Sequence, residues 1–132
     1  MIDYEEAVLG ILGATGPIPR NIILCTLQSI MRKPNLNADW SIAAALDRLI
    51  GKGYVVRKGT FYEKIGGDVE PCDLSSSRIV KTYCAVRDGA SSRKDLIAQT
   101  GVDRDHIGDL LRRMQKCGYI RETERGWVIA DD

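Results

Sequence analysis

The chain has 132 residues, of which 44% are hydrophobic and 28% are charged, a composition typical of a folded globular protein. Its formal net charge of +1 gives no overall electrostatic argument for binding nucleic acid. Apolar runs fall well short of the roughly 20 residues that a membrane span needs. The acidic start lacks the basic region of a secretory signal, so we expect a cytoplasmic protein without a membrane segment.

The first half of the chain predicts three helices and a hairpin. Apolar residues recur at helical spacing over 3–13, 19–32 and 38–51. Pro34 opens a loop over 34–37 that separates the second and third of these helices. A turn at Lys58-Gly59-Thr60 predicts a hairpin over 55–65.

The second half predicts the same order of elements. Helices are expected over 78–88, from Ser91 or Ser92 to about Thr100, and from Asp103 onward. Two short strands are expected within 121–131, on either side of a turn at Glu124-Arg125-Gly126. Ser77 and Asp103 are placed to cap the helices that they precede, because their side-chain oxygens can accept from free backbone N–H groups.

An internal repeat relates the two halves at a constant offset of 65 residues. In each copy an apolar helical stripe ends at a glycine, and an aromatic and a β-branched residue then begin a strand. The aligned pairs are Ile42 with Ile107, Leu46 with Leu111, Arg48 with Arg113, Gly53 with Gly118, Tyr54 with Tyr119, and Val55 with Ile120. The repeat predicts domain 1 over 1–66, a breaker-rich linker over 67–77 and domain 2 over 78–132.

The segment from Gly101-Val102-Asp103 through Leu111-Arg-Arg-Met to Gly118-Tyr119-Ile120 resembles a prokaryotic winged helix-turn-helix. It is most similar to regulators of the multiple-antibiotic-resistance and arsenic-repressor types, over about 45 residues. The resemblance implies a mainly α protein with small β-hairpin wings (α+β), made of two tandem winged-helix domains. It also implies DNA binding, a role in regulating transcription, and a dimer that duplicates the half-site.

The resemblance places the third helix of domain 2 in the major groove and the hairpins on phosphates. The residues implied to contact DNA are Arg104, His106 and Arg112 on the third helix, Arg93 and Lys94 at the start of the second helix, Arg121 and Arg125 on the wing, and Arg57 and Lys58 on the wing of domain 1. Arginine is suited to guanine edges, and cations near a helix start are suited to phosphates.

Three aspartates on the same helix favour a different interpretation. Asp103, Asp105 and Asp109 would oppose phosphates. They are equally explained if Asp103 caps the helix, Asp105 favours its first turn, and Asp109 pairs with Arg112 or Arg113. The alternative function is a tandem winged-helix scaffold that binds other proteins without reading DNA.

The third helix of domain 1 supports this alternative. Its positions equivalent to the reading face are rich in alanine and include Trp40. Such a face suits a protein partner or a second copy of the chain better than a duplex. Packing of Trp40 in the core under the second helix is the commoner fate of such a residue, and both interpretations stay open. In the hairpin of domain 1, aromatic residues alternate with basic ones, which fits either a nucleic-acid contact or a solvated hairpin with its aromatics turned inward.

The four cysteines stand far apart and form no Cys-x-x-Cys pair (Cys25, Cys72, Cys84 and Cys117). With a single histidine and no paired ligand spacing, we expect no metal and no cofactor. His106 has no nucleophile or carboxylate arrangement typical of catalysis around it, so we expect no enzymatic activity.

Overall fold

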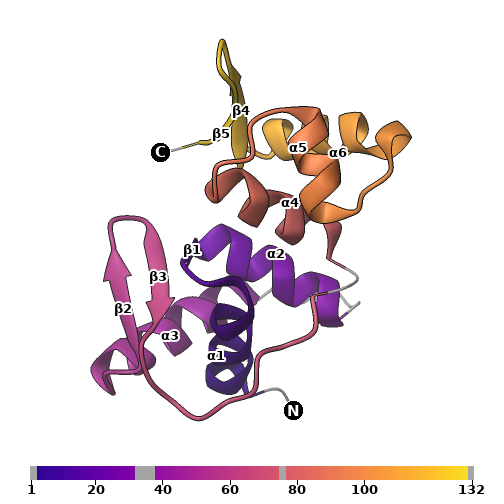
Figure 1. Ribbon diagram of the computed structural model, residues 1–132. Coiled ribbons are helices and arrows are strands. Elements are labelled where there is room, and N and C mark those ends of the chain that lie inside the picture. The colour runs from indigo at the N-terminus through magenta and orange to yellow at the C-terminus, as the bar shows by residue number, and fades with distance from the viewer. Residues whose placement is uncertain (1–2, 32–37, 75–76, 131–132) are drawn as a thin grey trace. The chain divides into compact units, whose positions relative to one another are not determined.

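A computed structural model describes residues 3–31, 38–74 and 77–130. The chain divides into two units, Met1–Ser76 (unit 1) and Ser77–Asp132 (unit 2). Both are mainly helical with a small antiparallel sheet, as the sequence predicted (Figure 1). None of the helices in the described ranges combines the length and apolarity that crossing a membrane requires. The predicted loop at 34–37 lies outside the described residues.

Unit 1 consists of three helices and a three-stranded sheet. In chain order its elements are α1 (Tyr4–Thr15), β1 (Ile18–Pro19), α2 (Arg20–Met31), α3 (Ala38–Gly51), β2 (Val55–Lys58) and β3 (Phe61–Lys64). The strand order is β1-β3-β2, with Ile18 opposite Tyr62 and Val55 opposite Lys64. The helices and the hairpin agree with the sequence prediction to within a few residues. The sequence did not predict β1.

The core of unit 1 lies where the apolar stripes of α1, α2 and α3 meet. Its fully buried side chains include Val8, Ile11, Leu12, Ile22, Ile23, Ile42, Leu46 and Leu49. They recur at helical spacing, so each helix turns one face inward. The burial of side chains of this size is the main favourable contribution to folding.

The segment 67–74, which the sequence predicted as part of a linker, packs against α1 within unit 1. The Cys72 N–H donates a hydrogen bond of 3.0 Å to the Gly10 carbonyl oxygen. Gly10 permits this approach, because a Cβ there would lie 3.3 Å from the Glu70 carbonyl oxygen. Unit 1 therefore extends past residue 66, and the division falls between Ser76 and Ser77. Residues 75 and 76 lie outside the described part.

Unit 2 repeats the order of helices and hairpin. Its elements are α4 (Arg78–Arg87), α5 (Arg93–Thr100), α6 (Arg104–Lys116), β4 (Ile120–Thr123) and β5 (Gly126–Ile129). The two strands form an antiparallel hairpin in which Ile120 is opposite Ile129. The core contains Val80, Tyr83, Leu96, Ile107, Leu111, Met114, Ile120 and Trp127.

A backbone hydrogen bond joins the hairpin of unit 2 to the connection between its first two helices. The Trp127 N–H donates to the Ser91 carbonyl oxygen at 2.9 Å. Ser91 lies just before α5, the second helix of unit 2, and β1 lies just before α2, the second helix of unit 1. The bond from Trp127 to Ser91 is therefore the counterpart in unit 2 of the pairing of β1 with β3 in unit 1. Gly126 has a φ of 112° and lies so close to Ser91 that a Cβ would be 2.9 Å from the Ser91 Cβ.

The helix caps of unit 2 follow the sequence prediction only in part. The Ser92 hydroxyl accepts from the Asp95 N–H at 3.2 Å, as expected for a cap of α5. The predicted side-chain caps of Ser77 and Asp103 are wrong, because neither side chain accepts a hydrogen bond from its helix. The Asp103 carboxylate instead lies 3.7 Å from His106 Nδ1, a contact that is an ion pair only when the imidazole is protonated.

Candidate functional site

The exposed face of α6 carries most of the site residues that the sequence predicted. Ile107, Leu110, Leu111 and Met114 are turned into the core of unit 2. Arg104, His106 and Arg112 are therefore left exposed on the other sides of the helix. Arg113, which the sequence analysis considered for this face only as a partner of Asp109, and Lys116, which it did not name, are exposed as well.

Arg93 extends this face from the start of α5. A Cβ built on Gly108 would lie 3.7–3.8 Å from the Nη1, Cζ and Nη2 atoms of Arg93. The guanidinium therefore lies over the one residue in the middle of α6 that has no side chain. Arg104 and Arg112 are one helical turn before and after Gly108, so they belong to the same row of α6 as the glycine that Arg93 covers.

The basic side chains of the two units differ in their pairing. In unit 1, intramolecular carboxylates pair with four of the six described cations: Arg20 with Asp39, Arg48 and Lys52 with Glu5, and Lys58 with Glu63. In unit 2, Arg87 is the one Lys or Arg that has an ion pair among the described residues. The Lys and Arg residues of unit 2 without an ion pair to a described residue are Arg78, Lys81, Arg93, Lys94, Arg104, Arg112, Arg113, Lys116, Arg121 and Arg125.

The contrast is sharpest between Arg20 and Arg93, the first residues of the second helices of their units. Arg20 Nε lies 3.3 Å from a carboxylate oxygen of Asp39 on α3. Arg93 lies over Gly108 of α6 without a carboxylate in ion-pair range in the described ranges. The same position is thus neutralised by the chain itself in unit 1 and left available in unit 2.

The remaining cations of unit 2 lie next to this face in sequence or on the hairpin. Lys94 follows Arg93 and is exposed, and Arg121 is exposed on β4. Arg125 lies in the turn, where its backbone N–H donates to Thr123 Oγ1 at 3.2 Å. The Thr123 hydroxyl in turn donates to the Gly126 carbonyl oxygen at 2.8 Å, which fixes this turn. Arg93 thus lies against α6, whereas neither Arg121 nor Arg125 forms an ion pair or a side-chain hydrogen bond with α6 among the described residues.

The predicted pairing of Asp109 with Arg112 or Arg113 is wrong. No ion pair within the described ranges joins Asp109, Asp105 or any neighbouring arginine of α6. The acidic and basic side chains of this face are exposed to water. Both signs of charge are therefore free for a partner.

Trp40 is not in the core, so of the two interpretations that the sequence left open the commoner one, burial under the second helix, is wrong. Its side chain is 75% exposed on α3, the helix of unit 1 that corresponds to α6. Ala43 and Ala44 lie beside it at helical spacing. This face combines a large aromatic residue with small ones, as the interpretation as a protein-binding face requires.

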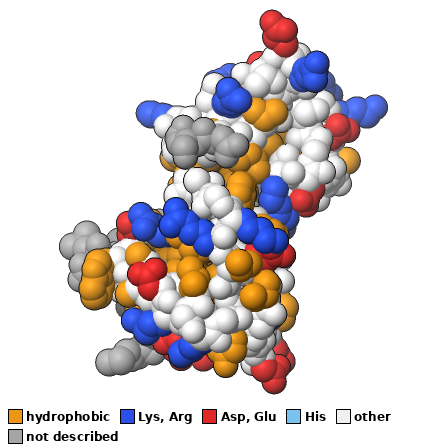
Figure 2. All heavy atoms as spheres, turned by 90° about the vertical axis from the view of Figure 1, so that its left-hand side faces the viewer, with side chains coloured by type: hydrophobic (Ala, Val, Ile, Leu, Met, Phe, Trp, Pro, Cys, Tyr) orange, Lys and Arg blue, Asp and Glu red, His pale blue; other side chains and the backbone are white. Residues whose placement is uncertain are grey.

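The hairpin of unit 1 carries Arg57 and Lys58, both exposed. The Arg57 guanidinium carbon lies 5.8 Å from the centre of the Tyr62 ring, and Lys58 Nζ lies 2.8 Å from a Glu63 carboxylate oxygen. Basic and hydrophobic side chains are neighbours on this side of unit 1 (Figure 2). Both cations are thus engaged within the hairpin itself.

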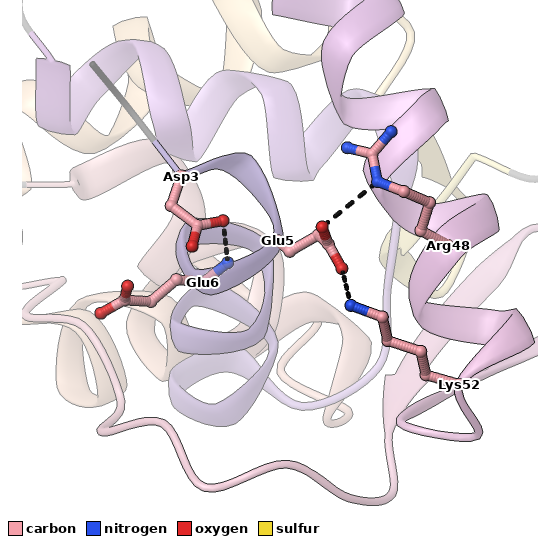
Figure 3. Close-up of polar contacts among 5 residues, drawn as sticks. All are labelled: Asp3, Glu5, Glu6, Arg48 and Lys52. Carbon is pink, nitrogen blue, oxygen red and sulfur yellow. Dashed lines mark hydrogen bonds and ion pairs between the residues drawn. The ribbon is translucent and has the colours of Figure 1, made fainter.

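Glu5 joins α1 to the last turn of α3 and to the residue that follows this helix. Its two carboxylate oxygens accept from Lys52 Nζ at 2.6 Å and from Arg48 Nε at 3.2 Å (Figure 3). The hydrogen bond from Lys52 is the main reason why the pKa of Glu5 is below its ordinary value. The same bond raises the pKa of Lys52. Each pKa change marks a charged form that the folded state favours.

We expect the substitution Glu5→Gln to lower the melting temperature at pH 7, and the difference from the natural chain to shrink in acid. A carboxylate with a lowered pKa stabilises the fold above its ordinary pKa of about 4.5, and this contribution is lost as the pH falls through the lower, folded-state value. Circular dichroism melts at several pH values measure it. Glu6→Gln is the matched control, because Glu6 has no ion pair in the described part. Equal effects of the two variants at pH 7 would contradict this role of Glu5.

None of the four cysteines forms a disulfide in the described part of the chain. Burial raises the pKa of the Cys72 thiol and of the Cys84 thiol, which disfavours the thiolate that metal binding or nucleophilic chemistry needs. No group of three His, Cys, Asp or Glu side chains within the described ranges is placed to hold a metal ion.

Comparisons of the chain with protein-family models, curated protein sequences and solved structures found no match. Its function is therefore inferred from its own residues and contacts.

Proposed function

We propose that both units are winged helices and that unit 2 binds double-stranded DNA, as part of a transcriptional regulator. The order helix, short strand, two helices and hairpin in unit 1 supports the assignment, as does its strand order β1-β3-β2. In unit 2 the bond from Trp127 to Ser91 replaces the short strand. In a winged helix, α6 would enter the major groove and the hairpin of β4 and β5 would contact the backbone.

The observation that carries this proposal is that every Lys and Arg of unit 2 except Arg87 lacks an ion pair with a described residue. A cation already paired with a carboxylate must give up that partner to bind a phosphate, whereas an unpaired exposed cation loses only water and counterions. The overall charge of the chain is close to neutral, so the argument depends on which cations are free. They are concentrated in the unit whose third helix has arginines around a glycine.

Each arginine of this face has a distinct proposed role. Arg93 is the first residue of α5, where free backbone N–H groups and the positive end of the helix also attract phosphate. Arg104 and Arg112 are on the groove-facing helix and can donate pairs of hydrogen bonds to guanine. His106, Lys94, Arg121 and Arg125 are proposed to add contacts to bases and phosphates, and Arg57 and Lys58 of unit 1 to contribute less because they are engaged within their hairpin.

Titration of the full chain against a random-sequence duplex at several salt concentrations tests the proposal. We expect binding that weakens with salt, and Arg93→Ala to weaken it by about three- to tenfold and to reduce the salt slope by about 1. Arg20→Ala is the matched control, since it removes the equivalent arginine that Asp39 already neutralises. It should leave the affinity unchanged.

Two results would contradict the proposal. The first is a dissociation constant weaker than about 10⁻⁴ M at low salt, which is weaker than ordinary non-specific binding to DNA. The second is an equal loss of affinity in Arg93→Ala and Arg20→Ala, because the affinity would then not depend on the unpaired cations of unit 2.

The exposure of Trp40 favours a second function, the docking of a protein or of a second copy of the chain on unit 1. Exposed tryptophan is uncommon on a monomer surface and is strongly enriched where proteins bind. If unit 2 does not bind DNA, this surface alone would make the chain a scaffold for other proteins. Both functions can also coexist, with unit 2 on DNA and unit 1 on a partner.

A further inference from the structure

We infer that the exposed face of α3 binds an amphipathic helix of another protein, with Trp40 as its anchor and a Lys or Arg of that helix paired with Asp47. This inference rests on the second proposed function, docking of a protein on unit 1. It does not depend on DNA binding by unit 2.

The face is continuous along the helix. Trp40, Ala44, Asp47 and Gly51 follow one another at intervals of four, three and four residues, which places them in one row on α3. Ala43 and Ile50, which is 38% exposed, border the same row. No atom of the described residues comes within 4 Å of a Cβ built on Gly51, so the far end of the row is open.

The sizes of these side chains favour a helix as the occupant. Two helices pack at distances of 8–10 Å that are set by the side chains between them, and alanine and glycine allow the closer approach. Trp40 stands at one end of the row, where it can cover apolar side chains of the incoming helix. A large aromatic residue beside small ones is a common arrangement for a residue that carries much of the binding energy.

The charges of the face decide among the partners. Asp47 is exposed and has no ion pair in the described part, whereas Asp39 is already paired with Arg20. The row carries this carboxylate and no Lys or Arg of its own, so it offers phosphates no favourable charge, and neither DNA nor an anionic membrane fits this face. A basic residue on the partner would complete it, because burial of Asp47 without a counter-charge is costly.

The same carboxylate disfavours a second copy of the chain. Two α3 helices packed antiparallel about a two-fold axis would meet near the middle of the row, between Ala44 and Asp47. The two Asp47 carboxylates would then approach each other, and like charges at close range repel. A helix with a basic residue at this point has no such conflict.

Two designed helical peptides test the inference on the full chain. Both carry a leucine stripe, and one has lysines beside the stripe where the other has glutamates. We expect the lysine peptide to bind at least about tenfold more tightly and to shift the emission of exposed Trp40 to shorter wavelength. The second tryptophan, Trp127, is only 7% exposed, so it contributes little to the shift.

Variants locate the binding. Trp40→Ala should abolish binding of the lysine peptide, and Asp47→Lys should reverse the preference between the two peptides. Ile65→Ala is the control, because it removes an apolar side chain that is 62% exposed outside α3. It should leave both affinities unchanged.

The inference is overturned if neither peptide binds, if Asp47→Lys leaves the preference unchanged, or if Trp40→Ala binds as the natural chain does. It is also overturned if sedimentation shows a dimer that Trp40→Ala dissociates, since a second copy then occupies the face. The duplex titration on Trp40→Ala separates the two proposals. We expect Trp40→Ala to keep its affinity for the duplex while it loses binding of the lysine peptide. If the natural chain does not bind DNA at all, the DNA proposal fails and the peptide result still tests this inference.

Discussion

The substitution Gly126→Ala is expected to lower the free energy of unfolding by about 2–6 kcal/mol. Two effects contribute to this loss. The φ of 112° is a backbone conformation that alanine adopts only with strain, about 1–3 kcal/mol. In addition, the new methyl group would overlap the carbonyl oxygen of Ser91 and lie 2.9 Å from its Cβ, which forces the backbone apart at a cost of about 1–3 kcal/mol.

Gly89→Ala separates these two effects. Gly89 has nearly the same φ, 110°, but no atom of the described residues lies within 4 Å of its added Cβ. The decrease in the free energy of unfolding in Gly89→Ala should therefore come from the backbone strain alone. Urea denaturation followed by the fluorescence of Trp127, beside the affected bond, measures both variants. Equal losses would show that the contact of Gly126 with Ser91 contributes nothing to stability.

The second large effect is expected on DNA recognition. The double variant Arg104→Ala with Arg112→Ala should lose at least about tenfold in affinity for a duplex selected by the natural chain. Each arginine in the groove that pairs with a guanine contributes about 1–3 kcal/mol to discrimination. The affinity for a random duplex should fall much less, since the phosphate contacts that we propose for Arg93 and the hairpin do not involve the substituted residues.

A matched control removes the same charge elsewhere in unit 2. Arg78→Ala with Lys81→Ala takes two unpaired cations from α4, which lies outside the proposed interface. This control should keep the preference for the selected duplex. The proposal that α6 reads bases is contradicted if Arg104→Ala with Arg112→Ala, like the control, weakens binding to the selected and the random duplex by the same factor.

The sequence predicted the helices and hairpins because their signals are local. Apolar residues at helical spacing, glycines after the helices and turn residues between the strands each act within a few positions. The strand β1 has no such signal. Ile18 and Pro19 form a strand only because they pair with Phe61 and Tyr62, more than 40 residues later in the chain.

The segment 67–74 is a second case in which a contact between residues distant in sequence decides the structure. Gly66, Gly67 and Pro71 are residues that typically break structure, so the sequence predicted a linker. The segment packs because α1 offers Gly10, where the backbone of Glu70 and Cys72 can approach closely. A packing partner this far away in sequence leaves no pattern in the segment itself.

For the candidate site, the sequence identified the right residue types but not their contacts. It placed Arg93, Arg104 and Arg112 in one site, and the contact of Arg93 with Gly108 brings them to one face. It could not show that Asp39 neutralises Arg20, because a pairing between helices depends on how the helices pack. The choice between a buried and an exposed Trp40 stayed open for a related reason. Tryptophan is usually buried, and only its position on α3 decides otherwise.

The bond from Trp127 to Ser91 also sets a spacing. Ser91 lies two residues before Arg93, and Trp127 lies two residues after Arg125. Because both bonded atoms belong to the backbone, the bond does not depend on which side chains stand at either place. The separation between the start of α5 and the tip of the hairpin is thus fixed by main-chain geometry, and the charges carried at the two ends can change without altering it.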